Sequence, residues 1–474
     1  MAVSIREMVS RPQGYSGPDV PDDDLLRACV HCGMCLPSCP TYRLTGNEAS
    51  SPRGRLWMMR AVADERLDLL DPEFDEQMYQ CLNCRACEAV CPSGVHYGPL
   101  VEAARAQLEE HRPRPAWQRV ARKVGMELPF ADVRRMRLMV NALRLYQRTG
   151  VSALLQRTGL LRLVRMETLE AMLPPIVEPP LVSGAEAWTP KDASDSAHLF
   201  NGCVMSTVFS HVNRAAGRVL ARNGVAVDVP VSQQCCGALH VHAGMMGEAR
   251  RLARVNIDAF ERSDAPVIVT AAGCGAALKE YGFLLKDDPV YAERALAFSE
   301  RVQDVTEYLG ARDLVPPTVP VVGTVTYQEP CHLAHAQRVT VEPRALLANV
   351  PGLVLEEMTE SSLCCGSAGI YNIIRKSMAD ELGDRKAAHI AATSAQTVVT
   401  ANPGCAMQLR TSLRRNGTEL PVRHIVEVLD EAYGGESGAS VDQRSIVLAS
   451  GNREGDQGGG AVAVRPDGER SAKV

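Results

Sequence analysis

Short apolar, β-branched runs alternate with helix-like segments through the second half of the chain, and each run ends at a cysteine. The runs are HLFNGC, VAVDVPVSQQCC and APVIVTAAGC, followed by TVTYQEPC, LVLEEMTESSLCC and TVVTANPGC. Between them lie helix-like segments such as 212–222 and 248–260. This alternation predicts parallel βαβαβ units. We therefore expect the cysteines at the carboxyl ends of the strands, where open α/β sheets bind ligands.

The cysteine pattern occurs twice, with offsets of 128, 129 and 131 residues between matching positions. These offsets predict a duplicated unit of about 130 residues. Glycines directly before three of the cysteines, Gly202, Gly273 and Gly404, would let the backbone approach a bulky cluster. The alternative is that these cysteines are small buried hydrophobic residues, but a Cys-Cys-Gly sequence in both copies disfavours it. The candidate metal ligands are Cys203, Cys235, Cys236 and Cys274 for a third cluster, and Cys331, Cys364, Cys365 and Cys405 for a fourth.

The first half of the chain carries the motif C-x2-C-x2-C-x3-C-P twice. In this motif three cysteines hold one [4Fe–4S] cluster, and the fourth ligates the cluster of the other motif. Structural zinc is the alternative, but zinc sites use separated C-x2-C pairs. Ser51 and Pro52, between the motifs, are typical of a helix start, so this region should be mainly helical. The predicted ligands are Cys29, Cys32, Cys35 and Cys91 for cluster 1, and Cys81, Cys84, Cys87 and Cys39 for cluster 2.

Between the two halves lies helix-favouring sequence without cysteine. From residue 111 to 166 it has 13 Arg and Lys residues against Glu127 and Asp132, whereas the whole chain has a net charge of −5. Residues 133–148 alternate arginine with Met, Leu and Val, as in a basic amphipathic helix. Such a helix could rest on anionic lipid or dock a partner. A solvated face beside an apolar stripe is the simpler interpretation.

Length and composition are those of a globular protein of several domains: 474 residues, 46% hydrophobic and 23% charged. No apolar run is long enough to span a membrane, and the first residues lack the pattern of a signal peptide, so we expect a cytoplasmic protein without disulfides. The predicted fold is multi-domain, α and α/β. Its predicted parts are an α-helical ferredoxin-like domain with two [4Fe–4S] motifs (1–100), a basic helical linker (101–190), two α/β cysteine-rich domains (195–312 and 318–432) and a disordered tail (433–474).

The paired ferredoxin motifs followed by two Cys-Cys-Gly units resemble the iron–sulfur subunits of glycolate oxidases, within the broader cysteine-rich domain family. That family also includes an anaerobic glycerol-3-phosphate dehydrogenase component, lactate-utilisation proteins and heterodisulfide reductase subunits. The resemblance covers residues 25–430. Within it, SPRGR at 51–55 and CHLAHAQ at 331–337 favour the glycolate oxidase branch. Heterodisulfide reductase-type domains end in C-x2-C, whereas Ala277 and Gln408 stand at those positions here.

The resemblance implies an electron-transfer subunit of an oxidoreductase complex that is inactive alone. A flavoprotein partner would oxidise glycolate to glyoxylate, and this chain would pass the electrons towards a quinone or another acceptor. In one arrangement, the chain would contact the cytoplasmic face of the membrane peripherally. The chain has no G-x-G-x-x-G after a strand and no P-loop motif, so we expect two [4Fe–4S] clusters, further clusters in the Cys-Cys-Gly units, and no flavin. Alternatives are a subunit for another 2-hydroxy acid or for glycerol-3-phosphate, and a heterodisulfide reductase-like enzyme. A redox-sensing regulator is a third class, but no DNA-binding element supports it, and we expect no nucleic-acid partner.

Histidines flank both Cys-Cys-Gly units. They could ligate metal, bond to cluster sulfur or carry protons to a quinone. Partly buried or surface histidines are the simpler interpretation, and we assign them no ligand role. The residues are His240 and His242 in the first unit, and His332 and His335 in the second.

Overall fold

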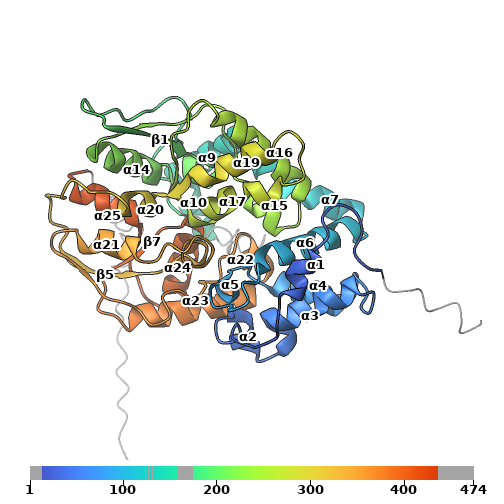
Figure 1. The fold of residues 1–474 in the computed structure, drawn as a ribbon. Helices are drawn as coiled ribbons and strands as arrows, with labels where there is room; N and C mark the ends of the chain where they lie inside the picture. The colour runs from blue at the N-terminus through green and yellow to red at the C-terminus, as the bar shows by residue number, and fades with distance from the viewer. Residues whose placement is uncertain (1–12, 123, 126–127, 131, 159–173, 436–474) are drawn as a thin grey trace, which may run out of the picture.

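The computed structural model describes residues 13–122, 124–125, 128–130, 132–158 and 174–435 (Figure 1). The tail predicted from residue 433 lies outside the described residues from 436 onward, as does part of the basic linker, 159–173.

The N-terminal part is helical, as predicted. The helix expected after the first cysteine motif begins at Pro52, and Ser51 Oγ caps it by accepting a hydrogen bond from Gly54 N at 3.0 Å. Buried Met59, Phe74 and Leu100 are part of its core. The elements are α1 (Asp23–Arg27), α2 (Pro40–Thr45), η2 (Glu48–Ser50), α3 (Pro52–Ala63), α4 (Pro72–Gln80), α5 (Ala86–Ala89) and α6 (Tyr97–His111).

The linker forms further helices, and one of them, α9 (Val133–Arg148), lies against the first α/β domain. The amphipathic helix predicted at 133–148 is confirmed, with Asp132 as its N-cap. Its residues Val133, Met136 and Val140 are buried in the core of that domain. In the described residues, no helix is both long and apolar enough to cross a membrane. The linker helices are α7 (Ala116–Arg122), α8 (Leu128–Phe130), α9 (Val133–Arg148) and α10 (Val151–Thr158).

Two four-stranded sheets follow, with the orders β2-β1-β3-β4 and β6-β5-β7-β8. All their strand pairs are parallel, which confirms the predicted α/β class. In the inner strands β1 and β3, the side chains of Leu199 and Ile268 are fully buried, as expected for parallel strands covered by helices on both faces. The fourth strand of each sheet, β4 and β8, was not predicted. Both are three residues long, and the sequences VQD and VRH carry no apolar run.

The first α/β domain contains β1 (Asp195–Phe200), α13 (Val204–Thr207), α14 (Ser210–Arg222), β2 (Val225–Asp228), α15 (Ala238–His242), α16 (Met246–Ala259), β3 (Val267–Val269), α17 (Ala272–Lys279), α18 (Tyr281–Leu284), α19 (Ala292–Arg301), β4 (Val302–Asp304) and α20 (Val305–Gly310). The second contains β5 (Gly323–Tyr327), a π-helical turn η4 (His332–Ala336), α21 (Glu342–Ala348), β6 (Leu353–Leu355), α22 (Tyr371–Ile374), α23 (Lys376–Ala391), β7 (Thr397–Thr400), α24 (Pro403–Arg415), β8 (Val422–His424) and α25 (Ile425–Ala432).

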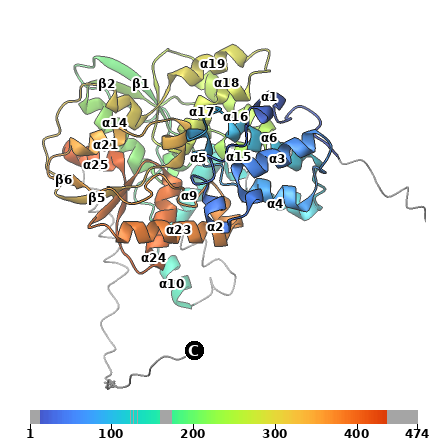
Figure 2. The ribbon, with the colours of Figure 1, turned by 60° about the horizontal axis from the view of Figure 1, so that its bottom comes forward.

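The two α/β domains pack together, and one hydrophobic core runs through both sheets. Helix α14 of the first domain lies against α25 of the second, where Arg218 pairs with Asp430 at 2.6 Å. The helical N-terminal part lies beside both domains (Figures 1 and 2). Arg105 donates to His242 O at 2.9 Å, and Tyr371 donates to Gln80 O at 2.9 Å. These contacts bring the two ferredoxin motifs close to the Cys-Cys-Gly units.

Candidate metal centres

The cysteines of the two ferredoxin motifs surround two small cavities. One, of about 30 Å³, is lined by Cys29, Cys32 and Cys35 of the first motif and by Cys91 of the second, and Cys87 of the second motif borders it as well. The other, of about 20 Å³, is lined by Cys81, Cys84 and Cys87 of the second motif and by Cys39 of the first. The fourth cysteine of each motif therefore lies with the first three of the other, which is the arrangement that cross-ligation requires.

A buried cation borders the second of these cavities. The guanidinium of Arg55 is fully buried and donates to Gln77 O at 2.7 Å and to Thr41 Oγ1 at 3.0 Å. Thr41 Oγ1 lies 3.2 Å from Cys39 Sγ. The oxygens that Arg55 contacts are uncharged, so they do not neutralise its positive charge. This charge could therefore stabilise an anionic cluster that thiolates hold in the cavity. The residues at this cavity thus fit an anionic iron–sulfur cluster.

The eight cysteines of the α/β domains form two quartets at the carboxyl ends of the strands. In the first quartet, Cys203 Sγ lies 3.4 Å from Cys235 Sγ, and Cys236 Sγ lies 3.2 Å from Cys274 Sγ. The thiols of the second quartet interact in the same order along the chain: Cys331, Cys364, Cys365 and Cys405. All sixteen cysteines are free thiols. Among the described residues, no three His, Cys, Asp or Glu side chains form a group that could hold a single metal ion.

The glycine of each Cys-Cys-Gly sequence is required by backbone geometry. Gly237 and Gly366 have φ values of 81° and 87°, in the left-handed region that favours glycine. A Cβ atom at Gly366 would lie 2.6 Å from the carbonyl oxygen of Ala379 in α23. The motif thus turns the chain sharply after the cysteine pair and lets a helix pack closely behind it.

One thiol of each vicinal pair has a lowered pKa. Hydrogen bonds from Cys203 and Cys236 hold the pKa of Cys235 well below its usual value. In the second copy, Cys364 and Cys405 lower the pKa of Cys365 in the same way. Since the thiolate is the form of cysteine that binds metal, these environments are chemically suited to a cluster.

The two copies differ three residues after Cys274 and Cys405, at the position where heterodisulfide reductase-type domains have a fifth cysteine. In the second copy, the side chain of Gln408 is buried and donates to Ala379 O at 3.0 Å. It also accepts a hydrogen bond from Asn372 at 3.1 Å. In the first copy, the small side chain of Ala277 lines a cavity instead.

The cysteine sets adjoin one another in space. Cys84 of the second ferredoxin motif is packed in one hydrophobic cluster with Cys364 of the second quartet. Asn402 connects the quartets, because its Oδ1 accepts from Gly273 N at 3.3 Å and its Nδ2 donates to Cys405 Sγ at 3.4 Å. The metal centres that these cysteines suggest would thus lie next to each other, from the helical part to the α/β domains.

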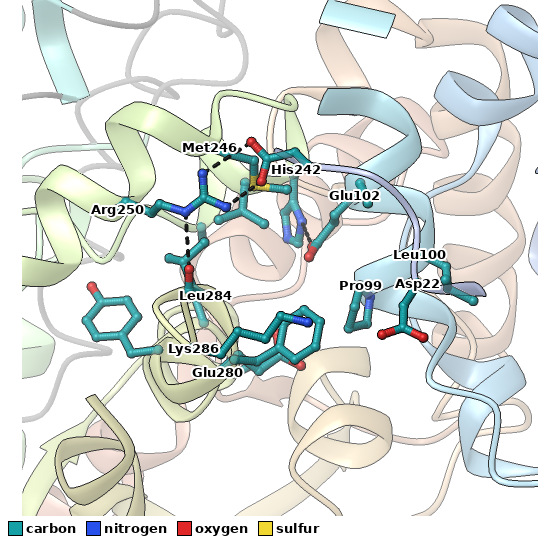
Figure 3. Close-up of a pocket in the computed structure, with 18 of the residues that line it drawn as sticks. Asp22, Pro99, Leu100, Glu102, His242, Met246, Arg250, Glu280, Leu284 and Lys286 are labelled. Atoms are coloured by element: carbon teal, nitrogen blue, oxygen red, sulfur yellow. Dashed lines mark hydrogen bonds and ion pairs between the residues drawn. The ribbon is translucent and has the colours of Figure 1, made fainter. Parts of the chain in front are cut away.

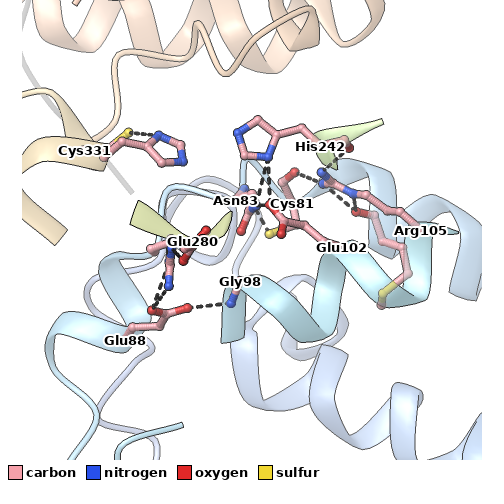
Figure 4. A network of polar contacts seen from close by, with 12 residues as sticks. Cys81, Asn83, Glu88, Gly98, Glu102, Arg105, His242, Glu280 and Cys331 are labelled. Atoms are coloured by element: carbon pink, nitrogen blue, oxygen red, sulfur yellow. Dashed lines mark hydrogen bonds and ion pairs between the residues drawn. The ribbon is translucent and has the colours of Figure 1, made fainter. Parts of the chain in front are cut away.

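A polar network lies between the helical part and the first α/β domain (Figure 4). Glu102 accepts a hydrogen bond from Asn83 at 2.7 Å and lies 2.9 Å from Nδ1 of His242. Burial lowers the pKa of His242, although Glu102 opposes this effect. Nearby, Arg85 pairs with Glu280 and Glu88. Burial raises the pKa of Glu280 to about 6, although Arg85 opposes this shift.

The flanking histidines lie in different surroundings. The rings of His242 and His332 are neighbours, with centroids 5.3 Å apart, and both line the cavity that Ala277 borders. His335 Nε2 lies 3.1 Å from Ser362 O, and His240 is fully buried. The acidic and amide residues of this network were not predicted from the sequence, because none of them is a cysteine ligand of a motif and they meet only through the tertiary fold.

Comparison with known proteins agrees with this organisation. The cysteine-rich domain family matches residues 197–279 and 325–410. The 4Fe-4S dicluster domain family matches residues 25–95. The linker region of the glycolate oxidase iron–sulfur subunit matches residues 117–173. These matches confirm the predicted duplication and the predicted order of a dicluster domain, a linker and two cysteine-rich domains.

Relatives match over most of the chain. The probable glycolate oxidase iron–sulfur subunit of Bacillus subtilis (strain 168) is 40% identical over 87% of this chain and 95% of its own length. The glycolate oxidase iron–sulfur subunit of Escherichia coli (strain K12) is 33% identical over 86% of this chain and 95% of its own. A hypothetical protein from Helicobacter pylori shares the fold, with a TM-score of 0.50 and 9% identity over 85% of this chain and 71% of its own. The chain belongs to the family of glycolate oxidase iron–sulfur subunits, and it is a component of an oxidoreductase.

Proposed function

We propose that this chain is the electron-transfer subunit of a flavin-dependent glycolate-oxidising complex. A flavoprotein partner removes two electrons from glycolate to give glyoxylate, and this chain carries the electrons towards a quinone. Iron–sulfur centres suit this task because each takes one electron and so connects a two-electron donor to a distant acceptor. Family membership supports this role, and the chain is not expected to oxidise glycolate alone.

We assign the two [4Fe–4S] clusters to the two cavities of the helical domain. Cluster 1 is held by Cys29, Cys32, Cys35 and Cys91, and cluster 2 by Cys81, Cys84, Cys87 and Cys39. The quartets Cys203, Cys235, Cys236, Cys274 and Cys331, Cys364, Cys365, Cys405 hold two further centres. The lining of the two cavities and the contacts between the quartet thiols support this assignment. The domain boundaries proposed with it are 1–100, 101–190, 195–312 and 318–432.

The observation that carries the proposal is that Cys84 and Cys364 belong to one hydrophobic cluster, against which Cys331 also packs. Electrons that reach cluster 2 would need to cross only this group of packed side chains to enter the second quartet. Asn402 then connects the second quartet to the first, because its side chain hydrogen-bonds to Cys405 Sγ and to the backbone N–H of Gly273, beside Cys274. The order of transfer would be cluster 1, cluster 2, the second quartet and the first quartet.

The test is anaerobic purification of the chain, followed by iron and sulfide analysis and electron paramagnetic resonance (EPR). The wild type is compared with Cys236→Ser and Cys365→Ser, and glycolate is added with and without the flavoprotein. We expect each substitution to remove the signal of one quartet and to leave the ferredoxin signals in place. About eight irons that survive both substitutions would confine the clusters to the helical domain.

The source of the electrons is tested separately. Glycolate should reduce the clusters only when the flavoprotein is present. Reduction by another 2-hydroxy acid or by glycerol-3-phosphate, but not by glycolate, would reassign the substrate. Turnover of a disulfide by the isolated chain with reduced viologen would instead establish a heterodisulfide reductase-like enzyme.

We also propose that the chain works at the cytoplasmic face of a membrane, where a quinone is accessible. The exposed side of α9 supports this placement, since it carries the apolar side chains of Leu138, Met139 and Leu145 next to Arg134 and Arg135. A basic helix with an apolar face of this kind binds anionic lipid surfaces.

A further inference from the structure

A cavity of about 150 Å³ lies where the helical domain meets the first α/β domain (Figure 3). Leu100 and Glu102 of α6 form one side, and His242 and Met246 form another. Cys236 of the first quartet lines the cavity, as does Gly273, which precedes Cys274. A small molecule in this cavity would therefore contact the first quartet directly.

We propose that this cavity binds the headgroup of a quinone and is the place where electrons leave the chain. The inference rests on the proposed function and adds the site and chemical class of the acceptor. A cavity of this volume is large enough for a six-membered carbon ring, and apolar side chains form part of its lining. Leu100, Leu284 and Ala277 supply apolar walls for such a ring.

The polar atoms that face the cavity suit the two oxygens of a quinone. His242 has Nδ1 engaged with Glu102, and its other ring nitrogen is directed away from that contact (Figure 4). His332 Nε2 is buried and has no hydrogen-bond partner among the described residues. An imidazole nitrogen can donate to a quinone carbonyl or accept from a quinol hydroxyl. Lys286 provides a further donor on the wall.

The mouth of the cavity suits the prenyl tail of a membrane quinone. Val20 and Phe283 line the cavity and are 42% and 46% exposed. Large apolar side chains at the rim of a pocket give a tail an apolar exit, and they favour a ligand that is itself partly apolar.

The first copy of the repeat has this cavity because its residue at the fifth-cysteine position is small. Gln408 fills the corresponding place in the second copy with a buried, hydrogen-bonded side chain. Ala277 leaves space on the wall one turn after Cys274. The two copies thus differ at this position, where the first has a small residue on the cavity wall and the second has a buried glutamine.

The redox step balances with the partners already named. One quinone takes up two electrons and two protons and becomes a quinol. The electrons leave two reduced one-electron centres of this chain, which the flavoprotein has reduced, and the protons come from water at the mouth of the cavity.

The test is binding of 2-heptyl-4-hydroxyquinoline N-oxide, a quinone analogue, to the full chain purified anaerobically with its clusters. Quenching of the probe's fluorescence reports binding. We expect saturable binding to the wild type and at least tenfold weaker binding to Ala277→Gln, which places the second copy's side chain in the cavity. Val290→Gln is the control, because Val290 is 64% exposed and lies outside the cavity lining.

Absence of binding, or equal binding to Ala277→Gln and the wild type, would overturn the proposal. Displacement of the probe by glutathione disulfide but not by a short-chain quinone would also overturn it and would assign the site to disulfides. Reduction of the clusters by glycolate and the flavoprotein, followed by EPR without any quinone, tests the proposed function independently. An intact EPR spectrum of Ala277→Gln shows that the substitution has not damaged the first quartet.

Discussion

Asn402 connects the two cysteine quartets through a single amide side chain. Its Nδ2 donates to Cys405 Sγ in the second quartet at 3.4 Å, and its Oδ1 accepts from Gly273 N, beside Cys274 of the first, at 3.3 Å. Hydrogen bonds to ligand sulfur raise the reduction potential of a cluster, because they stabilise the added negative charge.

We therefore expect Asn402→Ala to lower the potential of the centre held by the second quartet. The lost hydrogen bonds should also reduce the free energy of unfolding by about 1 kcal/mol. A redox titration followed by EPR measures the potential, and chemical denaturation measures the stability. An unchanged potential with reduced stability would show that Asn402 has only a structural role.

Crossed ligation in the helical domain can be tested with paired substitutions. Cys39 lies with Cys84, and Cys91 lies with Cys32, although the members of each pair belong to different motifs. Cys39→Ser should therefore alter the same EPR signal as Cys84→Ser, and Cys91→Ser the same signal as Cys32→Ser. If Cys39→Ser and Cys32→Ser altered one common signal, each motif would hold its own cluster.

The sequence predicted the cysteine sets and the secondary structure that positions them, because both depend on local signals. The apolar runs before Cys203 and Cys331 became β1 and β5, and the α9 helix has the predicted bounds. The sequence could not predict which residues meet between domains. Arg85 and Glu280 are an example: 195 positions separate them, Arg85 occupies a spacer position of the second ferredoxin motif, and only the tertiary fold brings the two together.

Lys386 makes the surroundings of the two quartets electrostatically unequal. Ala379 lies against Gly366 in the second copy, and Ala249 lies against Gly237 in the first. When these two alanines are aligned, Lys386 of the second copy corresponds to Asn256 of the first. Lys386 is 1% exposed and donates to Ser361 O at 3.1 Å. Burial lowers its pKa to about 8, so the ammonium group remains protonated at pH 7.

A buried positive charge favours the reduced form of a nearby cluster. Lys386→Gln should therefore lower the potential of the centre at the second quartet and leave that of the first unchanged, as measured by redox titration. Lys376→Gln is the control, since Lys376 lies on the same helix but its side chain is 50% exposed. Equal shifts at both quartets would mean that the substitution disturbs the fold rather than the local charge.

His424 makes the contact between the α/β domains sensitive to acid. Its Nε2 lies 2.8 Å from Thr270 O of the other domain and donates to it, and its Nδ1 accepts from Val426 N at 3.3 Å. Burial lowers the pKa of His424 to about 4, although nearby Glu427 opposes the shift and His211 adds to it. The folded state therefore favours the neutral ring.

The stability that comes from this preference is fully present above pH 6.5 and is lost as the pH falls towards 4. The loss corresponds to about 3 kcal/mol. We expect the free energy of unfolding of His424→Asn to fall less than that of the wild type between pH 7 and pH 5. His96→Gln, which changes an exposed histidine, should keep the slope of the wild type. Parallel slopes for all three proteins would show that His424 does not govern the acid sensitivity.

The basic helix α9 gives a prediction about membrane binding. Arg134 and Leu138 lie one turn apart on its exposed surface, and Leu145 lies two turns beyond Leu138, so cations and apolar side chains share one face. Flotation with vesicles that contain phosphatidylglycerol should recover the chain, and recovery should fall as salt is added. Replacing Arg134 and Arg135 together with Gln should weaken binding by about 2 kcal/mol, or about 30-fold. The control is a second double variant, Arg222→Gln with Arg262→Gln, which removes the same number of positive charges from outside the linker. Binding that is insensitive to salt, or equally weak in both double variants, would show that α9 is a solvated surface and that the chain reaches its quinone by another contact.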